Sequence, residues 1–336
     1  MRLWDARALR HVIWLLVIIV AAAGLGWFVM IRMPGRSHAG PLPPLSAREQ
    51  AISQAARRDV QKLAGELGPR SVYQPKALHA AADYIEQSLR QAGFTVERQT
   101  FPAQQESCVN LQAELRGAAR PEEIVVIGAH YDSVMWGPGA DDNASGVAAL
   151  LALARAFAGK PPARTVRFVA FANEEPPFFK TEGMGSLVYA RSCRDRGDHV
   201  VAMLSLESLG IYSDAPGSQR YPFPLGLFYP SRGDFVGFVS RTADRRLVAR
   251  CVETFRQQAR FPCEGGAVPG WLPGLDWSDH WAFWQAGYPA LMVTDTAPFR
   301  SPDYHKESDT PEKVDYDRLA RVITGLETVV EDLANR

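Results

Sequence analysis

Several patterns that would assign a function directly are missing from this sequence. Its 336 residues include 37 basic and 37 acidic side chains, which leave no net charge, and they contain no long basic run. A nucleic acid is therefore not an expected partner. No GxSxG motif stands at a strand-to-helix turn, which disfavours a serine hydrolase. No internal repeat or low-complexity segment is present, and 46% hydrophobic residues suffice for a sizeable core.

Cysteine is scarce, and the four cysteines form no CxxC pattern. Zinc-finger and thioredoxin-type sites are therefore excluded. In an oxidising compartment Cys108, Cys193, Cys251 and Cys263 could form two disulfides. The expected pair is Cys251 with Cys263, which lie closest together in the sequence. Four buried free thiols are the open alternative.

One hydrophobic run is long enough to span a membrane. Residues 12–31 contain no charged side chain, and twenty residues at about 1.5 Å each give about 30 Å, the thickness of a bilayer core. Three arginines precede the run and two follow it, which favours a cytoplasmic N-terminus. Apolar sequence continues past the alanines at 21–23. We therefore expect residues 1–32 to form an uncleaved membrane anchor rather than a removed signal peptide.

After the anchor, residues 33–46 are rich in proline and glycine and form a predicted linker. Residues 47–336 then form one predicted domain outside the cytoplasm, on the periplasmic or extracellular side. Helices are expected at 46–67, 75–91, 145–157, 185–193, 234–260, 279–285 (capped by Ser278) and 311–333. Strands are expected at 94–101, 108–115, 124–129, 166–172, 200–206 and 290–294.

The alternation of these elements predicts an α/β fold. A mostly parallel central sheet would carry helices on both faces, which makes three layers, with right-handed connections. Residues 209–232 are rich in proline, glycine and tyrosine and are expected to form a long functional or capping loop.

Side chains that can bind metal ions follow the predicted central strand. His130 stands just past the strand at 124–129, and Asp132 lies close enough to fix the orientation of its imidazole. Asp142 follows in the glycine-bounded stretch GADDNASG. A carboxylate can bridge two divalent ions, and the small neighbours of Asp142 allow an unusual backbone there.

Two further strands end in acids. The strand at 166–172 runs into Glu174 and Glu175, where one carboxylate could ligate a metal while the other takes a proton from water. The strand at 200–206 ends at Glu207, and His305 stands just before the C-terminal helix. Two histidines and three carboxylates at strand ends and loops are suited to a pair of co-catalytic metal sites.

These motifs, in this order, resemble the M28 family of zinc peptidases, which includes aminopeptidases and the related glutaminyl cyclases. The likeness covers roughly residues 60–335 and rests on GAHYDS, GADDNASG, FANEE, LESLG, SDHWAFWQAGYPA and YHKESDTPEKVDY. It implies a zinc exopeptidase-like fold with two zinc ions per chain. The implied ligands are His130, Asp142, Glu175, Glu207 and His305. Asp142 would bridge the ions. His130 and Glu207 would complete one site, and Glu175 and His305 the other.

The resemblance also implies roles for neighbouring residues. Glu174 would be the general base, Asp132 would support His130, and the peptide bond after the bridging Asp142 would be cis. At one position the chain departs from the family pattern, because family aminopeptidases usually carry Asp where this chain has Glu207. The extra methylene moves the carboxylate further from its backbone, which puts occupancy of both metal sites in question.

Asp279 and His280 open a predicted helix near the last strand. We expect both to stand behind the ligands or in the substrate pocket rather than to bind metal, and Asp279 is the stronger of the two. The tryptophans at 271, 277, 281 and 284 are expected in the core, with a substrate pocket as the alternative.

The resemblance implies a membrane-anchored metallopeptidase that removes N-terminal residues from peptides. A metal-bridged hydroxide would attack the peptide carbonyl, and Glu174 would pass the water proton to the leaving amine. Two alternatives stay open: a single-zinc glutaminyl cyclase, which Glu207 motivates, and a non-catalytic binding domain of the same fold. The preferred side chain, amino- versus carboxypeptidase action and the oligomeric state are not predicted.

Overall fold

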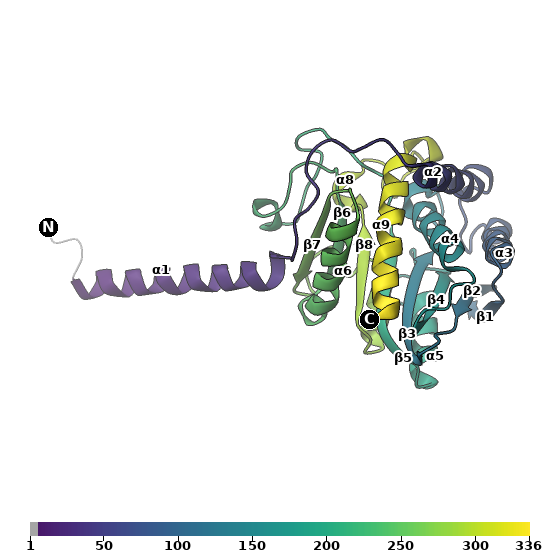
Figure 1. The fold of residues 1–336 in the computed structure, drawn as a ribbon, viewed down its shortest axis with the longest axis horizontal. Helices are drawn as coiled ribbons and strands as arrows, with labels where there is room; N and C mark the ends of the chain where they lie inside the picture. The colour runs from purple at the N-terminus through teal and green to yellow at the C-terminus, as the bar shows by residue number, and fades with distance from the viewer. Residues whose placement is uncertain (1–5) are drawn as a thin grey trace.

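The structure is a computed structural model that describes residues 6–336. A long helix, α1 (Ala6–Gly26), continues into the π-helical turn η1 (Trp27–Ile31) and projects from one edge of an α/β domain (Figure 1). Residues 9–31 of this segment are mostly apolar and are long enough to cross a membrane, by length and composition. The first residues of the predicted anchor, 1–5, lie outside the described part of the chain.

The domain is built on one eight-stranded sheet with the order β1-β2-β4-β3-β5-β8-β6-β7. The strands are β1 (Val96–Ala103), β2 (Glu106–Leu115), β3 (Arg120–His130), β4 (Arg164–Phe171), β5 (His199–Glu207), β6 (Val236–Arg241), β7 (Cys263–Val268) and β8 (Ala290–Thr294). The central strands β4, β3, β5 and β8 are parallel, while β1, β2 and β6 introduce antiparallel pairs.

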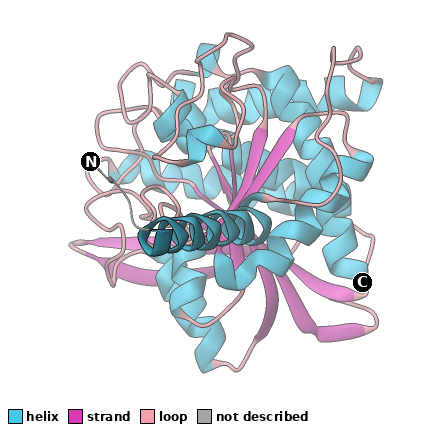
Figure 2. Ribbon diagram, turned by 90° about the vertical axis from the view of Figure 1, so that its left-hand side faces the viewer, coloured by secondary structure: helices cyan, strands magenta, loops and turns pink. Residues whose placement is uncertain are grey.

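Helices cover both faces of this twisted sheet (Figure 2), which confirms the predicted three-layer α/β class. They are α2 (Ala47–Val60), α3 (Pro75–Gln91), α4 (Gly146–Phe157), α5 (Gly185–Asp195), α6 (Arg245–Gln258), α7 (His280–Gln285), α8 (Ala297–Arg300) and α9 (Tyr316–Asn335). One core cluster joins α3, α4, α6 and α9 to one face, with α2 outside them. A second cluster joins α5 and α7 to the other face.

The apolar run that predicts β3 is buried on both sides, as a central parallel strand requires. Val125 and Ile127 belong to the first core cluster, whereas Ile124 and Val126 belong to the second. Neighbouring β4 places Phe168 against the rings of Phe94 and Phe157. Alternating side chains of the central strands therefore fill both layers, and the strand ends are left to carry polar residues.

The prediction of a mainly helical segment at 234–260 is wrong in its first part. Residues 236–241 form β6, and only residues 245–258 form the helix α6. Strand β7 was also not predicted, because its sequence CEGGAV carries two glycines that weaken a strand pattern. Gly265 is required there, since a Cβ atom would lie 2.6 Å from Val252 and 2.9 Å from Met33. Tertiary packing, rather than local propensity, decides this region.

The expected disulfide between Cys251 and Cys263 is also wrong. All four cysteines are free and buried, on β2, α5, α6 and β7. Burial raises the pKa of the Cys263 thiol to about 12. They occupy core positions as small apolar side chains, which is the alternative that the sequence left open.

Candidate metal centre

The five predicted ligands lie together beyond the carboxyl ends of the central parallel strands. His130 is the last residue of β3 and Glu207 the last residue of β5, and Glu175 follows β4. Asp142 lies in the π-helical turn η3 (Ala140–Ser145) that precedes α4. His305 comes from the loop before the short helix η6 (Pro311–Lys313). This edge is where an open α/β sheet places its sites.

The ligands form two sets that share Asp142. In the first set, His130 Nε2 lies 3.4 Å from Asp142 Oδ1 and 3.3 Å from Glu207 Oε2. In the second set, His305 Nε2 lies 3.1 Å from Asp142 Oδ2 and 3.2 Å from Glu175 Oε2. Within each set the ligand atoms lie within 4.8 Å of one another. Asp142 therefore turns one oxygen to each set.

These separations fit zinc. Zinc binds nitrogen and oxygen at about 2.0–2.2 Å in tetrahedral geometry, so two of its ligands lie about 3.4 Å apart. The four measured separations of 3.1–3.4 Å match this value. Each set offers three protein ligands, which leaves a fourth position open, as in catalytic rather than structural zinc sites.

Unpartnered polar atoms also point to a cation. The ring nitrogens of His130 and Glu175 Oε1 are buried without a hydrogen-bond partner among the described residues, and buried polar atoms normally have one. Burial raises the pKa of Glu175 to about 7, and the charge of Asp142 adds to this. A divalent cation would ligate His130 Nε2 and the Glu175 carboxylate and would offset the crowded negative charge.

Asp132 contacts both His130 and the backbone of the two glutamates that follow β4. Its Oδ1 lies 3.4 Å from His130 Nδ1, whereas Asp142 and Glu207 lie near the other ring nitrogen, Nε2. The same carboxylate accepts hydrogen bonds from the backbone N–H groups of Glu174 and Glu175, at 3.0 and 3.1 Å. The sequence predicted the contact with His130 but not the contacts with the two glutamates.

Glu174 lies beside both sets without belonging to either. Its Oε2 is 4.0 Å from His130 Nε2, and its side chain is buried. Burial raises the pKa of Glu174 well above its usual value, and the nearby Glu175 and Glu207 carboxylates act in the same direction. A raised carboxyl pKa suits a group that must take up and release a proton near neutral pH.

Comparison with known proteins assigns this arrangement to a family. Residues 110–330 match the model of peptidase family M28. The chain belongs to this family. A protein of Escherichia coli (strain K12), named uncharacterized protein YfbL, is 37% identical over 294 residues, which are 85% of this chain and 90% of that protein. The resemblance predicted from the motifs is thereby confirmed.

Solved structures share the fold of this M28 chain at low sequence identity. A zinc aminopeptidase from Bacillus subtilis matches with a TM-score of 0.69 and 15% identity, over 84% of this chain and 95% of that one. A glutaminyl cyclase from Fimbriiglobus ruber matches with a TM-score of 0.62 and 20% identity, over 88% and 97%. Family and fold together support a peptidase hydrolase that uses zinc.

The loop that carries Asp142 in this M28 chain is held in an unusual backbone. The Asp142–Asn143 peptide bond is cis, as the resemblance implies. Asn143 is fully buried. Its side chain donates a hydrogen bond to Leu206 O and accepts hydrogen bonds from the backbone N–H groups of Ser208 and Gly146. Gly139 begins the loop with φ +59°, and a Cβ there would lie 2.2 Å from Asp142 O. Only glycine fits that position.

Two residues that fix this loop were not predicted as site residues. The Asp309 carboxylate accepts the backbone N–H groups of Asp141 and Asp142, at 2.9 and 3.1 Å. Arg70 is fully buried and donates to the carbonyls of Tyr131, Pro138 and Gly139. Little in the sequence indicated either residue. Asp309 lies in the stretch around His305 that resembles the family, and Arg70 comes just after the end of a predicted helix.

Glu207 is also held by neighbours. Its Oε2 accepts a hydrogen bond from Ser278 Oγ at 2.7 Å, and its Oε1 accepts one from Ser208 Oγ at 3.0 Å. Ser278 is therefore not the predicted helix cap, because Asp279 occupies the position before α7 and the Ser278 hydroxyl is used by Glu207. The longer glutamate side chain reaches the first metal set in a defined orientation.

Asp279 and His280 have different surroundings in the structure. Asp279 is buried, neither carboxylate oxygen has a hydrogen-bond partner among the described residues, and it interacts electrostatically with His130 and Glu207. Burial raises the pKa of Asp279 to about 7. His280 instead bonds Leu275 O at 2.7 Å and packs edge-to-face on Trp284. His280 belongs to neither ligand set, and because its partner Leu275 lines the pocket described below, a supporting role for it stays a prediction.

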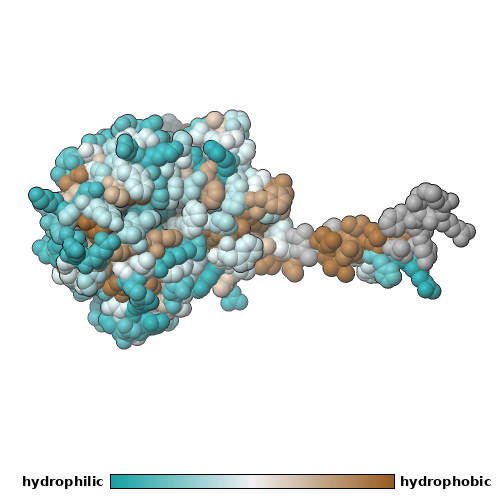
Figure 3. All heavy atoms as spheres, turned by 180° about the vertical axis from the view of Figure 1, so that it is seen from behind, coloured by the Kyte–Doolittle hydropathy of each residue, from teal (hydrophilic) through white to brown (hydrophobic). Residues whose placement is uncertain are grey.

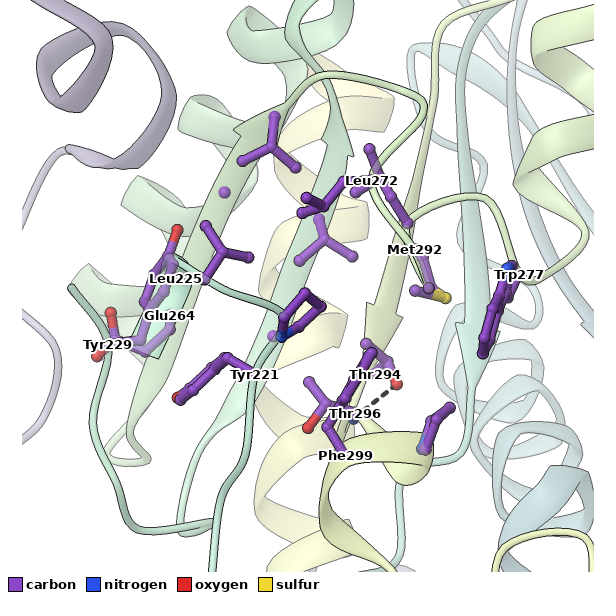
Figure 4. Close-up of a pocket in the computed structure, with 18 of the residues that line it drawn as sticks. Tyr221, Leu225, Tyr229, Glu264, Leu272, Trp277, Met292, Thr294, Thr296 and Phe299 are labelled. Atoms are coloured by element: carbon purple, nitrogen blue, oxygen red, sulfur yellow. Dashed lines mark hydrogen bonds between the residues drawn. The ribbon is translucent and has the colours of Figure 1, made fainter. Parts of the chain in front are cut away.

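A pocket opens beside the first metal set (Figure 4). Glu207 of the first metal set and Tyr304 are among its lining residues, and strands β6, β7 and β8 form its floor. Tyr221 and Tyr229 close one side and Trp277 the other (Figure 4). Most of the lining is apolar. Of the four tryptophans, Trp277 thus contributes to the pocket, while Trp284 is buried in the core.

Proposed function

We propose that this chain is a membrane-anchored aminopeptidase that uses two zinc ions. The observation that carries the proposal is the pair of three-ligand sets joined through Asp142, with separations of 3.1–3.4 Å. Zinc-binding residues of this kind could be structural or catalytic. The open fourth position in each set and the adjacent apolar pocket favour catalysis.

In this proposal, His130, Asp142 and Glu207 hold one ion, and Asp142, Glu175 and His305 hold the other. When bound, zinc supplies Lewis acidity that lowers the pKa of water and polarises a carbonyl. Glu174 takes a proton from the attacking water and returns it to the leaving amine. Asp132 fixes the His130 ring and the backbone of both glutamates, so that the base and the ligands keep one geometry.

The charge around the pocket favours a free N-terminus over a free C-terminus. Beyond the ligands, Glu174 and Asp279 add carboxyl groups close to His130. None of the described residues that line the pocket is lysine or arginine, although a substrate carboxylate would need such a partner. An α-ammonium group, by contrast, is attracted to surplus carboxylates. This distribution supports aminopeptidase rather than carboxypeptidase action.

The pocket favours a large apolar residue at the substrate N-terminus. Its walls include Leu225, Leu272, Met292 and Phe299 beside the aromatic side chains already described (Figure 4). Apolar surface buried on binding contributes about 25 cal/mol per Å². Leucine, methionine or phenylalanine at this position would therefore be preferred over glycine or an acidic residue.

The same proposal includes the membrane topology. The apolar helix at 9–31 would span the bilayer, with its arginine-flanked start in the cytoplasm and residues 33–336 on the other side. A cleaved signal sequence would have a similar composition. The mature N-terminus of the membrane-bound protein, read by sequencing, separates these two cases.

The test of function uses the purified full chain and peptides that differ only at the N-terminus. We expect release of leucine from a peptide with a free amine and none from the N-acetylated peptide. Glu174→Gln should keep zinc and fold but lower kcat by at least about a hundredfold, whereas Glu122→Gln, on the exposed surface, should change nothing. An unimpaired Glu174→Gln enzyme would refute the assigned base.

A glutaminyl cyclase is the second candidate, because one shares this fold with a TM-score of 0.62. It would release ammonia from a peptide that begins with glutamine and leave the peptide bonds intact. Ammonia release without amino-acid release would replace the aminopeptidase proposal.

A further inference from the structure

The end of the apolar helix is fixed to the domain. Arg245 of α6 donates hydrogen bonds to the carbonyls of Phe28, Val29 and Arg32, which are free at the end of a helix. Arg256 bonds Pro34 O at 3.0 Å, and Cys263 N bonds Ser37 Oγ at 3.0 Å. The predicted linker thus begins as a strap along α6 and β7, and the domain has a set position relative to α1.

This attachment places the pocket beside the end of the helix. Met30 and Ile31 pack against the same apolar cluster as Leu225 and Leu272, which are walls of the pocket. Figure 1 shows the loop that contains η4 (Leu225–Leu227) on the side of β7 from which α1 emerges. The opposite end of the sheet, at β1, lies far from the helix.

Two loops of the pocket expose large apolar side chains on their outer surface. Phe223, Leu227 and Phe228 are 87%, 74% and 47% exposed, and Trp271 is 80% exposed. We name these four residues the apolar patch. They alternate with residues of the same loops that face the pocket, such as Leu225 and Leu272. Figure 3 shows apolar surface where the helix leaves the domain.

The patch lies at the level where a spanning helix meets the lipid headgroups. The stretch Leu9–Ile31, which includes Arg10 near its start, is about 35 Å long at about 1.5 Å per residue, so its two ends would meet the two surfaces of a hydrocarbon core of about 30 Å. Its last turn, with exposed Trp27 and Phe28, therefore reaches the headgroup layer. Aromatic side chains concentrate at this layer. Since η1 is fixed to α6 and packs on the same cluster as the pocket loops, a spanning α1 would hold the apolar patch near the same layer.

We propose that the apolar patch is a second membrane contact, which seats the mouth of the pocket on the bilayer that α1 spans. This inference rests on the anchor in the proposed function. A water-facing loop surface would favour polar residues, whereas phenylalanine, leucine and tryptophan gain free energy by entering the interface. The pocket then receives peptides that are themselves held at the membrane surface. The substrate class is therefore membrane-associated peptides, including those that carry an acyl chain.

The direct test measures the surroundings of the patch in the full chain. The four native thiols are buried, so a fluorophore will label a cysteine introduced at Leu227 or, as the matched control, at exposed Gln105 beyond β1. The protein is placed in phosphatidylcholine nanodiscs. Quenching by lipid-borne nitroxide and by aqueous iodide is then compared for Leu227→Cys and Gln105→Cys.

We expect the label at 227 to be quenched by the lipid nitroxide and shielded from iodide, with the opposite result at 105. Equal iodide quenching at both positions would overturn the proposal. Shielding from iodide without quenching by lipid would also overturn it, because a second copy of the chain or another protein would then cover the patch. Neither result depends on catalysis, so failure of the proposed enzyme activity is recognised separately.

The proposed substrate class can be tested by comparing the rates at which a soluble and an acylated peptide are cleaved. The double variant Phe223→Ser with Leu227→Ser should cleave a short soluble peptide as the native protein does, because neither side chain lines the pocket. Cleavage of the same peptide carrying a C-terminal acyl chain, in nanodiscs, should fall by about tenfold. An equal rate on the acylated peptide would contradict the proposed orientation of the pocket.

Discussion

Replacing Asp309 with asparagine should weaken both metal sites together. Asp309 belongs to neither ligand set, but its two carboxylate oxygens accept hydrogen bonds from the backbone N–H groups of Asp141 and Asp142. Asparagine has the same shape and keeps only one acceptor, so its amide N–H₂ would face one of these N–H groups. A hydrogen bond to a charged acceptor contributes about 1.5–3 kcal/mol. Because Asp142 belongs to both ligand sets, displacement of its backbone affects both.

The expected loss in zinc affinity is about 10–100-fold for each ion, the range found for residues that support metal ligands. Competition with a chromophoric chelator measures both binding steps. Glu307→Gln is the matched control, because it lies in the same turn, is exposed and should bind zinc as the native chain does. Thermal unfolding of the zinc-free proteins shows whether the fold is retained. A folded Asp309→Asn protein with native affinity for both ions would refute the supporting role of Asp309.

Three further predictions address the site and the core. Ser278→Ala removes the 2.7 Å hydrogen bond to Glu207. It should lower the affinity for one zinc ion about tenfold and leave the affinity for the other unchanged. If the same chelator assay shows an equal loss at both sites, the assignment of Glu207 to one set is contradicted. Phe168→Ala leaves a cavity at a fully buried position and should lower the free energy of unfolding, measured by urea titration, by about 3–5 kcal/mol. A loss below about 1 kcal/mol would argue against the packing described for β4. Chelation of zinc should lower the melting temperature of the protein, because an ion present at about a thousand times its Kd stabilises the fold by about 4 kcal/mol. An unchanged melting temperature would indicate that the protein held no tightly bound ion.

The local sequence was sufficient to predict the central strands and the polar residues that gather at their ends. An apolar run followed by a polar residue, as at His130 and Glu207, marks both a buried strand and the end that faces a site. The contacts that hold these ligands were not predictable in the same way. Asp309 lies 168 residues from Asp141, and no local pattern shows that its carboxylate will meet that backbone.

The region between residues 209 and 275 was the least predictable. Strands β6 and β7 are short, and β6 gains its place by pairing with β8 and β7 rather than by local propensity. The pocket depends on this pairing, because β6 and β7 form part of its floor. The apolar patch could not be found from the sequence either, since exposed and pocket-facing side chains alternate irregularly in loops.

We propose that the chain holds two zinc ions through the two ligand sets that share Asp142. The most direct measurement is the zinc content of the purified full chain, by elemental mass spectrometry, together with that of Asp142→Ala. We expect two zinc ions per native chain and the loss of both in the variant, because Asp142 belongs to both ligand sets. No zinc in the native chain, even after zinc is added back, would contradict the proposal.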